Sequence, residues 1–266
     1  MSSVIGVTHC MSQKLISTCP DWVQELKGRE LSGEQKSDEW LQQRSHMLTA
    51  SNAGCALGDN PYTSRNAFIN QKCVDPTGVN SFAGNSSTMW GEHWEQAALQ
   101  KYCDLYHKDV YAFNLIKHKE FDWMGGSPDG ITHDGILIEI KCPKARRIKP
   151  NSVGAIPIYY IDQVQMLMHI CELDQCHFVQ YKPYDGEFSP EVFDVISIPK
   201  DPNWWLNGFP ILQSTWSIIV DRRQKLANGE ALDVLDDPNS TTAKRAKTQQ
   251  VEKFSSNQTM QCLFAK

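Results

Sequence analysis

The sequence lacks the features of a secreted or membrane-spanning protein. In its 266 residues, no apolar run approaches the roughly 20 residues that a helix needs to cross a bilayer. The start, MSSVIGVTHC, has neither the basic head nor the apolar stretch of a signal peptide. We therefore expect an intracellular protein, in the cytoplasm or the nucleus, with no membrane partner.

Also lacking are an excess of positive charge and a cysteine framework. The net charge of −5 argues against a protein that holds nucleic acid through bulk positive charge, although a locally basic site is still allowed. The nine cysteines include no C-x2-C pair, and no histidine pair at zinc spacing accompanies them. We expect reduced thiols in a reducing compartment rather than a structural zinc or iron–sulfur site.

What the sequence does have is a globular composition with clear periodic patterns. Hydrophobic residues make up 41% and aromatic residues 10% of the chain, enough for a sizeable core. Helical spacing and caps predict helices over residues 37–44, 52–58, 64–69, 87–103, 159–171 and 207–226. Alternating apolar patterns predict strands over 110–113, 119–124, 135–141, 177–181 and 192–198. These elements predict an α/β (α+β) fold with a central mixed β-sheet flanked by helices.

Composition divides the chain into three parts. Residues 1–36 are mixed in character and predict an N-terminal arm that contains at most a short helix. Residues 37–226 carry the periodic patterns and form one domain, with a loop over residues 75–87. Residues 227–266 are polar and poor in aromatics, so we expect a flexible C-terminal extension.

The stretch most informative about chemistry is Asp129, followed after nine residues by Glu139-Ile140-Lys141. Side chains alternate along an extended strand, so Glu139 and Lys141 share one face. The other face carries the isoleucines that anchor the strand in the core, Ile136, Ile138 and Ile140. A turn at residues 134–135 would fold Asp129 back beside Glu139.

Two carboxylates held within a few ångströms repel each other, so a cation must neutralise them or one must take a proton. Mg²⁺ prefers one or two carboxylates completed by waters and phosphate oxygens. Lys141 lies where it could orient a metal-bound water or help to deprotonate it, and this arrangement predicts phosphodiester hydrolysis. The alternative is a surface hairpin with a solvated Glu–Lys pair, which is the usual meaning of an isolated D…ExK pattern.

A run of cations without an acid follows directly: Lys141, Lys144, Arg146, Arg147 and Lys149. Charge runs are usually solvated faces. This one leaves the predicted metal site where a polyanionic strand would pass, so we expect Lys144, Arg146 and Arg147 to bind DNA.

The segment Ser127-Pro128-Asp129-Gly130 with Glu139-Ile140-Lys141 resembles the lambda-exonuclease, or YqaJ-like, group of PD-(D/E)xK nucleases, which serve phages and large DNA viruses in recombination and genome processing. Three more family elements occur in the order that the family shows. Two precede this segment, R…TAS at Arg44 and Thr49-Ala50-Ser51 and G-xxx-E at Gly91 and Glu95, and one follows it, Y-xx-Q-x-Q over residues 160–165. The resemblance spans about residues 38–181 and implies a restriction-endonuclease-like PD-(D/E)xK core.

The resemblance implies a role for each matching residue at the centre. Asp129 and Glu139 would be metal ligands, and the carbonyl of Ile140 would add a third. Glu95 would point toward a second metal ion or its waters, so two Mg²⁺ ions, or Mn²⁺ in their place, are expected. Lys141 would position the attacking water.

The resemblance also implies a pocket for a terminal 5′-phosphate, formed by Arg44, Ser51, Ser127 and Gln163. A guanidinium binds phosphate through two hydrogen bonds, and hydroxyl and amide groups supply the rest. Each residue has a simpler alternative: Arg44 could pair with a helix acid, and Ser51 could only cap a helix. Gln163 and Gln165 lie two positions apart and cannot share a helix face, and we expect Gln163 to face the site.

The function implied is a Mg²⁺-dependent 5′→3′ exonuclease on linear double-stranded DNA, which leaves a 3′ single strand for an annealing protein inside a virus-infected host cell. Family relatives are often toroidal trimers, so a homotrimer is one option beside a monomer or dimer. Two alternatives remain open at this point. One is a structure- or sequence-specific endonuclease on the same core, and the other is a non-catalytic module that binds DNA ends.

Overall fold

The computed structural model describes residues 20–33, 35, 37–74, 86–184, 186, 190–233 and 235. The chain divides into two compact units, Met1–Gln224 and Lys225–Lys266, and the helices and strands below lie in the first unit except for the last three residues of the final helix. The loop predicted over residues 75–87 lies mostly outside the described residues, as does most of the predicted C-terminal extension. In the described ranges no helix is long and apolar enough to cross a membrane.

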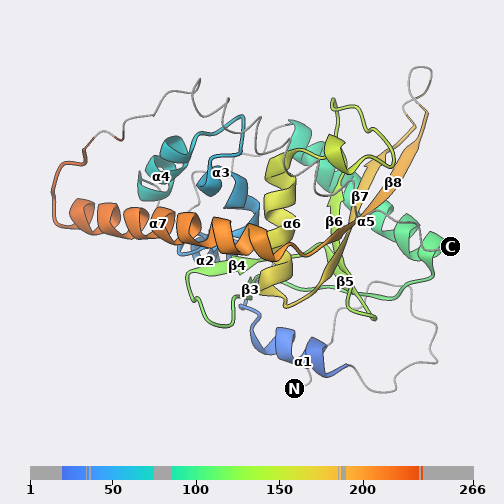
Figure 1. Cartoon of the computed structure of the whole chain (residues 1–266), viewed down its shortest axis with the longest axis horizontal. Helices are drawn as coiled ribbons and strands as arrows, with labels where there is room; N and C mark the ends of the chain where they lie inside the picture. The colour runs from blue at the N-terminus through green and yellow to red at the C-terminus, as the bar shows by residue number, and fades with distance from the viewer. Residues whose placement is uncertain are drawn as a thin grey trace. The chain divides into compact units, whose positions relative to one another are not determined.

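The larger sheet has five strands in the order β2-β5-β6-β7-β8 (Figure 1). Its strands are β2 (Val110–Tyr111), β5 (Gly130–Thr132), β6 (Leu137–Lys141), β7 (Gln175–Lys182) and β8 (Val192–Pro199). Only β6 and β7 pair in parallel, and the other three pairs are antiparallel. The parallel pair needs a crossover, which helix α6 (Ile158–Ile170) provides. The predicted mixed sheet is confirmed.

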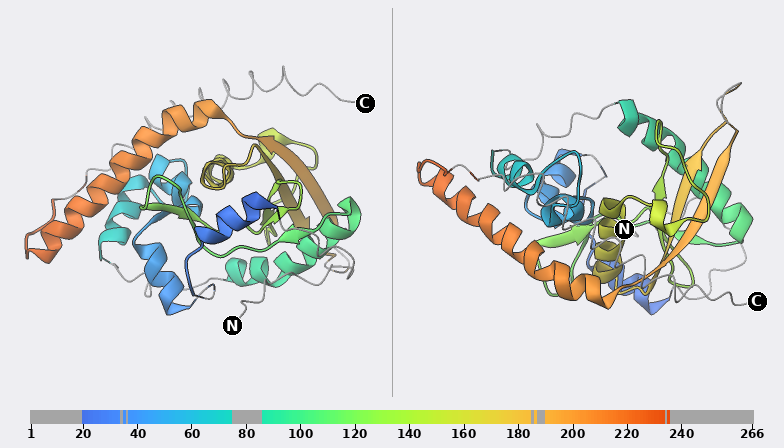
Figure 2. Two further views of the ribbon diagram at one scale, coloured as in Figure 1. Left: turned by 90° about the horizontal axis from the view of Figure 1, so that it is seen from below. Right: turned by 45° about the horizontal axis from the view of Figure 1, so that its top comes forward.

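A smaller sheet of three strands has the order β1-β4-β3. It consists of β1 (Leu48–Thr49), β3 (Ile116–Lys117) and β4 (Met124–Gly126). Helix α6 contacts both sheets, and the left view of Figure 2 looks along α6 and shows it enclosed by other elements. This central position agrees with its burial, because most of its residues are buried.

Helices lie at every place where the sequence predicts one, although α4 and α7 are longer than expected. They are α1 (Asp21–Gly28), α2 (Asp38–Ser45), η1 (Ala50–Asn52), α3 (Ala53–Leu57), α4 (Arg65–Val74), α5 (Ser86–Tyr106), η2 (Val153–Ala155) and α7 (Pro202–Ala227). The hydroxyl of Ser37 accepts a hydrogen bond of 3.2 Å from Trp40 N at the start of α2. Gly58 ends α3 in the left-handed conformation, with φ +81°.

The strand β6 is buried on both faces. Ile138 and Ile140 pack against α5 in a cluster that includes Leu99 and Tyr102. The opposite face is covered as well, since Glu139 is only 1% exposed. The expectation that three isoleucines anchor one face is therefore wrong in one detail: Ile136 precedes the strand and is half-buried.

Two glycines let α6 approach its neighbours closely. A Cβ on Gly54 of α3 would lie 2.5 Å from Cβ of Tyr159, and one on Gly126 of β4 would lie 2.6 Å from Cδ2 of Leu167. Neither position has room for a side chain. As a result α3, η1 and β4 all lie against the helix that carries Gln163.

The predicted strand over residues 119–124 is wrong. These residues form bends and a turn, and β4 starts only at Met124 and continues through Gly125 and Gly126. The aromatic residues that suggested a strand pack instead against helix α7, where Phe121 and Trp123 each contact the ring of Phe209. Helix α7 also begins earlier than predicted, at Pro202.

Candidate active site

The hairpin β5–β6 brings Asp129 and Glu139 together. Gly130 pairs with Ile138 in the antiparallel ladder, and the turn passes through Gly135, whose φ of +80° suits glycine. Asp129 Oδ2 accepts a hydrogen bond of 2.6 Å from the backbone N–H of Ile140. The first carboxylate is thus fixed to the strand that carries the second, as the sequence predicts.

The third member of the cluster, Lys141, lies on the same face of β6 as Glu139. Its Nζ donates a hydrogen bond to Oε1 of Glu139. The same oxygen accepts a hydrogen bond of 2.6 Å from Nε2 of Gln163 in α6. Gln165 turns elsewhere, donating to the carbonyl of Pro199 at 2.9 Å. The structure therefore places Gln163 beside a carboxylate.

The surroundings of this cluster disfavour ionisation of both of its carboxyl groups. Burial, and then the charge of Asp129, raise the pKa of Glu139 to about 8. Burial also raises the pKa of Asp129. Burial alone would lower the pKa of Lys141, but the charges of Glu139 and Asp129 outweigh it and raise that pKa above its ordinary value. Both carboxylates therefore need a positive neighbour to ionise.

Glu95 approaches the cluster from α5. It is half-buried, and its charge raises the pKa values of both Glu139 and Cys142. Ile140 contributes its backbone N–H to Asp129, while its side chain is buried in the core on the α5 side. Glu95 thus lies within electrostatic reach of the two carboxylates.

The donor set fits a hard divalent cation. The second oxygen of Glu139, Oε2, is buried and has no hydrogen-bond partner among the described residues. In the described part of the chain no three His, Cys, Asp or Glu side chains gather closely enough to hold a metal on their own. The remaining ligands would then be water, backbone carbonyl or phosphate oxygens, which Mg²⁺ accepts readily.

Arg44, at the end of α2, has hydroxyl groups as its polar partners. Its Nη2 donates to Ser51 Oγ at 2.8 Å and to Thr49 Oγ1 at 3.3 Å. The guanidinium carbon lies 4.3 Å from the ring centre of Trp40. Burial lowers the pKa of Arg44 to about 10. Among the described residues no carboxylate pairs with it, so its charge is left for another anion.

Ser127 follows β4 and carries a second unsatisfied group. Its Oγ is buried and lacks a hydrogen-bond partner among the described residues. The preceding residue, Gly126, has room only for a hydrogen, because a Cβ there would lie 3.1 Å from Cβ of Ala50 in η1. Ser127 therefore follows a residue that packs against η1, the element that carries Ser51. Thr49, which the sequence did not reveal as a partner of Arg44, lies at the start of η1.

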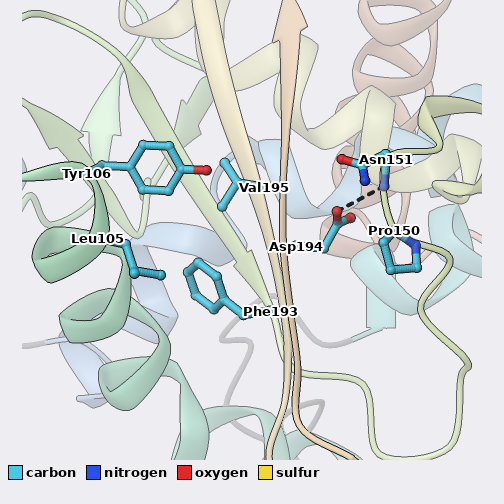
Figure 3. Close-up of a pocket in the computed structure, with 7 residues that line it drawn as sticks. All are labelled: Leu105, Tyr106, Pro150, Asn151, Phe193, Asp194 and Val195. Carbon is cyan, nitrogen blue, oxygen red and sulfur yellow. Dashed lines mark hydrogen bonds between the residues drawn. The ribbon is translucent and has the colours of Figure 1, made fainter.

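The basic run is only partly exposed. Lys144 and Arg147 are exposed, whereas Arg146 is half-buried and its Nη2 donates to Gln180 Oε1 at 2.8 Å. The reading of the sequence missed Gln180, because a buried glutamine within a strand has no local signal. A pocket at the edge of β8, shown in Figure 3, contains none of the predicted site residues.

Comparison with known proteins supports the same region. The model of the YqaJ-like viral recombinase domain matches residues 39–174. An uncharacterized protein of Acanthamoeba polyphaga mimivirus is 32% identical over 165 residues, which cover 56% of this chain but only 29% of that protein.

Solved structures show the same fold. The alkaline exonuclease LHK-Exo of Laribacter hongkongensis superimposes with a TM-score of 0.59 and 22% identity over 73% of this chain and 97% of that one. Its complex with dAMP gives a TM-score of 0.58 over the same shares.

Proposed function

The chain belongs to the YqaJ-like viral recombinase domain family, and from this premise we propose that it is a Mg²⁺-dependent 5′→3′ exonuclease acting on linear double-stranded DNA. The observation that supports this most strongly is the buried cluster of Asp129, Glu139 and Lys141. Folding places two carboxylates together at an electrostatic cost, and one of them keeps a buried oxygen that has no hydrogen-bond partner in the part of the chain that the structure describes. Such a cost is expected where a bound cation is part of the working protein.

Asp129 and Glu139 would hold the metal, with Glu95 and the carbonyl of Ile140 as further ligands directly or through water. A divalent ion bound there would supply Lewis-acid activation of water and neutralise charge on the phosphate. Mn²⁺ could replace Mg²⁺, and a second ion would lie on the side of Glu95. The fold of LHK-Exo, which has been solved with bound dAMP, is consistent with a nucleotide-containing substrate.

Lys141 would orient the attacking water rather than remove its proton. Its raised pKa keeps the side chain protonated at neutral pH, and an ammonium group has only donors to offer. Held by Glu139, it presents its remaining N–H groups toward the reacting phosphate. The positive charge then stabilises negative charge that develops in the transition state.

Arg44, Ser51 and Ser127 would bind the terminal 5′-phosphate. The half-buried guanidinium of Arg44 has hydroxyl partners and no carboxylate partner among the described residues, so a bound phosphate would neutralise its charge. Gln163, the fourth residue expected in this pocket, donates to Glu139 and would thus connect the pocket to the metal site. Lys144, Arg146 and Arg147 would follow the backbone of the strand beyond the cut.

The product would be a duplex with a 3′ single strand, ready for a single-strand annealing protein in recombination or viral genome processing. A homotrimer around the DNA would make digestion processive. Both partners belong to this proposal, and cross-linking and sizing of the purified chain would test the second.

The experiment that tests the function compares three substrates in Mg²⁺: linear duplex with a 5′-phosphate, linear duplex with a 5′-hydroxyl, and a covalently closed circle. We expect mononucleotide release from the first, slower release from the second and none from the third, and EDTA should abolish all of it. Cleavage of the circle would instead indicate the endonuclease alternative. Binding of linear ends without hydrolysis in any divalent ion would indicate a non-catalytic module.

A further inference from the structure

A row of polar side chains crosses three strands beside the proposed catalytic lysine. Lys141 of β6 is the register partner of Gln180 in β7, and Gln180 is the register partner of Asp194 in β8. Register partners on neighbouring strands project from the same face of a sheet. Gln180 is only 1% and Asp194 only 5% exposed. Buried polar groups of this kind are costly unless they are fully bonded.

The basic segment, residues 142–151, is tied to this row at two points. Arg146 Nη2 donates to Gln180 Oε1 at 2.8 Å, and Gln180 Nε2 donates to Asp194 Oδ2 at 3.1 Å. The backbone N–H of Asn151 donates to Asp194 Oδ1 at 2.9 Å, as Figure 3 shows. The middle of the basic segment, through Arg146 and Gln180, and its end, through Asn151, are thus anchored on one buried carboxylate.

The orientation of the Gln180 amide is determined by its two partners. The guanidinium of Arg146 offers only donors, so the amide oxygen must face it. The carboxylate of Asp194 offers only acceptors, so the amide nitrogen must face that side. The amide therefore links a buried negative charge to a positive charge at the surface, and neither charge contacts the other directly.

The outer end of this chain of hydrogen bonds lies next to the proposed catalytic lysine. The ring of Tyr160 in α6 has Lys141 Nζ 5.1 Å from its centre and the guanidinium carbon of Arg146 6.0 Å from it. The two cations therefore lie around one aromatic ring. A network that only stabilised the fold would not need to end at a partly exposed cation beside the proposed catalytic lysine.

We propose that Gln180 and Asp194 are positioning residues, which hold Arg146 where it contacts a phosphate of the strand that enters the site. This inference rests on the proposed nuclease function. Neither residue touches DNA, since both are buried. They act through Arg146 by restricting its rotamers, so that little conformational entropy is lost when the phosphate binds.

A double-mutant cycle tests this directly. Gln180→Met keeps the volume of the side chain but removes both hydrogen bonds, and it is measured alone and together with Arg146→Met. Gln175→Met serves as the matched control, because Gln175 lies on the same strand and loses only its bond of 2.6 Å to Ser197 Oγ. The assay is release of nucleotides from linear 5′-phosphorylated duplex, with kcat and KM determined at several salt concentrations.

We expect Gln180→Met to raise KM about tenfold, the size expected for loss of one charge-assisted hydrogen bond to phosphate, with kcat nearly unchanged. The slope of log KM against log salt should fall by about one in Arg146→Met, which removes a phosphate contact, and by less in Gln180→Met, which leaves the guanidinium present but unrestrained. In the Arg146→Met background, Gln180→Met should add nothing to KM. The control Gln175→Met should stay within about twofold of the unmodified chain in KM and salt slope.

An equal rise in KM in both backgrounds, or no rise in either, would overturn the proposal. Should Gln180→Met not fold, Asp194→Asn replaces it, because this variant keeps the shape but opposes one of the two donors with an amide nitrogen. It should raise KM in the same direction, again only when Arg146 is present. Inactivity of the unmodified chain would contradict the nuclease function itself, whereas additive variants in an active chain contradict only the positioning role.

Discussion

The cluster of Asp129, Glu139 and Lys141 and the pocket around Arg44 are held in place by different means. The cluster belongs to one hairpin of a buried sheet, and the ladder of β5 and β6 sets its geometry. The Arg44 pocket is built from the end of a short helix and a 3-10 turn. The charged residue of this pocket, Arg44, is half-buried, whereas Glu139 is almost fully buried.

Distant side chains support the pocket. Lys72 Nζ donates to the carbonyls of Arg44 at 2.8 Å and Met47 at 3.0 Å, and Arg223 of α7 donates to the carbonyl of Ser45 at 2.9 Å. The carbonyls of Arg44 and Ser45 lie in the last turn of α2 and that of Met47 lies just beyond it, where carbonyls lack the regular donors of a helix interior. The comparison teaches that the proposed chemical centre is fixed by local backbone, whereas the proposed recognition of a DNA end at Arg44 would depend on tertiary contacts from remote helices.

The largest effect is expected at the cluster itself. Lys141→Ala should reduce hydrolysis by about a thousandfold, because the group that orients water and faces the phosphate is lost, while affinity for DNA ends changes little. The measurement is single-turnover digestion together with end binding in Ca²⁺. Lys144→Ala, an exposed cation of the same run, is the control and should alter KM alone. A variant at Lys141 that keeps its rate would refute the assigned role.

Arg44→Ala should have the next largest effect, and on specificity rather than on chemistry. Loss of a guanidinium–phosphate contact of about 1.5–3 kcal/mol corresponds to about a 10- to 100-fold loss of preference for 5′-phosphate over 5′-hydroxyl ends. The ratio of kcat/KM on the two ends measures it, and Arg44→Lys should recover only part. If the ratio stays as in the unmodified chain, the phosphate lies elsewhere.

Arg223→Met tests the remote support of the pocket. It removes donors from the end of α2, so we expect a loss of about 1–3 kcal/mol in the free energy of unfolding and a few-fold loss of end preference. Denaturant titration and the same end-preference assay check both. Gln213→Ala, at an exposed position of the same helix, should change neither. An unaltered end preference in a destabilised Arg223→Met would mean that the pocket does not depend on α7.

The sequence predicts the cluster better than the pocket for a physical reason. The positions of Asp129, Glu139 and Lys141 follow from one turn and the alternation of one strand, which are local rules. The sequence predicts that Gln163 faces the site, but it does not predict the hydrogen bond that Gln163 donates to Glu139. The catalytic and binding roles given to these residues stay predictions.

Other features could not be read from local patterns. The partner of Arg146 lies 34 residues away, and the donor to the Ser45 carbonyl lies 178 residues away. The strand wrongly predicted over residues 119–124 has the same cause. Phe121 and Trp123 gave the apolar pattern of a strand, but they pack against Phe209 of α7. An alternating pattern indicates burial, but it does not say against what.

A further prediction concerns stability and pH. In metal-free protein the pKa of Glu139 is about 8 against an ordinary value of 4.5, so between these pH values the folded state binds more protons than the unfolded state. The free energy of unfolding should therefore fall as pH rises from about 4.5 to about 8, and the raised pKa of Asp129 acts in the same direction. Denaturant titrations without metal should show this fall, and Glu139→Gln should reduce it.

Magnesium should oppose that fall. The ion binds the ionised carboxylates of the folded chain, so its stabilising effect should grow with pH over the same range. Equal stability curves with and without Mg²⁺ at pH 8 would mean that the cluster does not bind the ion.

The central claim is that the two carboxylates of the hairpin hold a divalent cation beside Lys141. Anomalous diffraction from crystals soaked in Mn²⁺ tests it most directly. We predict a strong anomalous peak between the carboxylates of Asp129 and Glu139, which disappears in Glu139→Gln. Soaked crystals with no peak there, or with a peak that persists unchanged in the variant, would contradict the account.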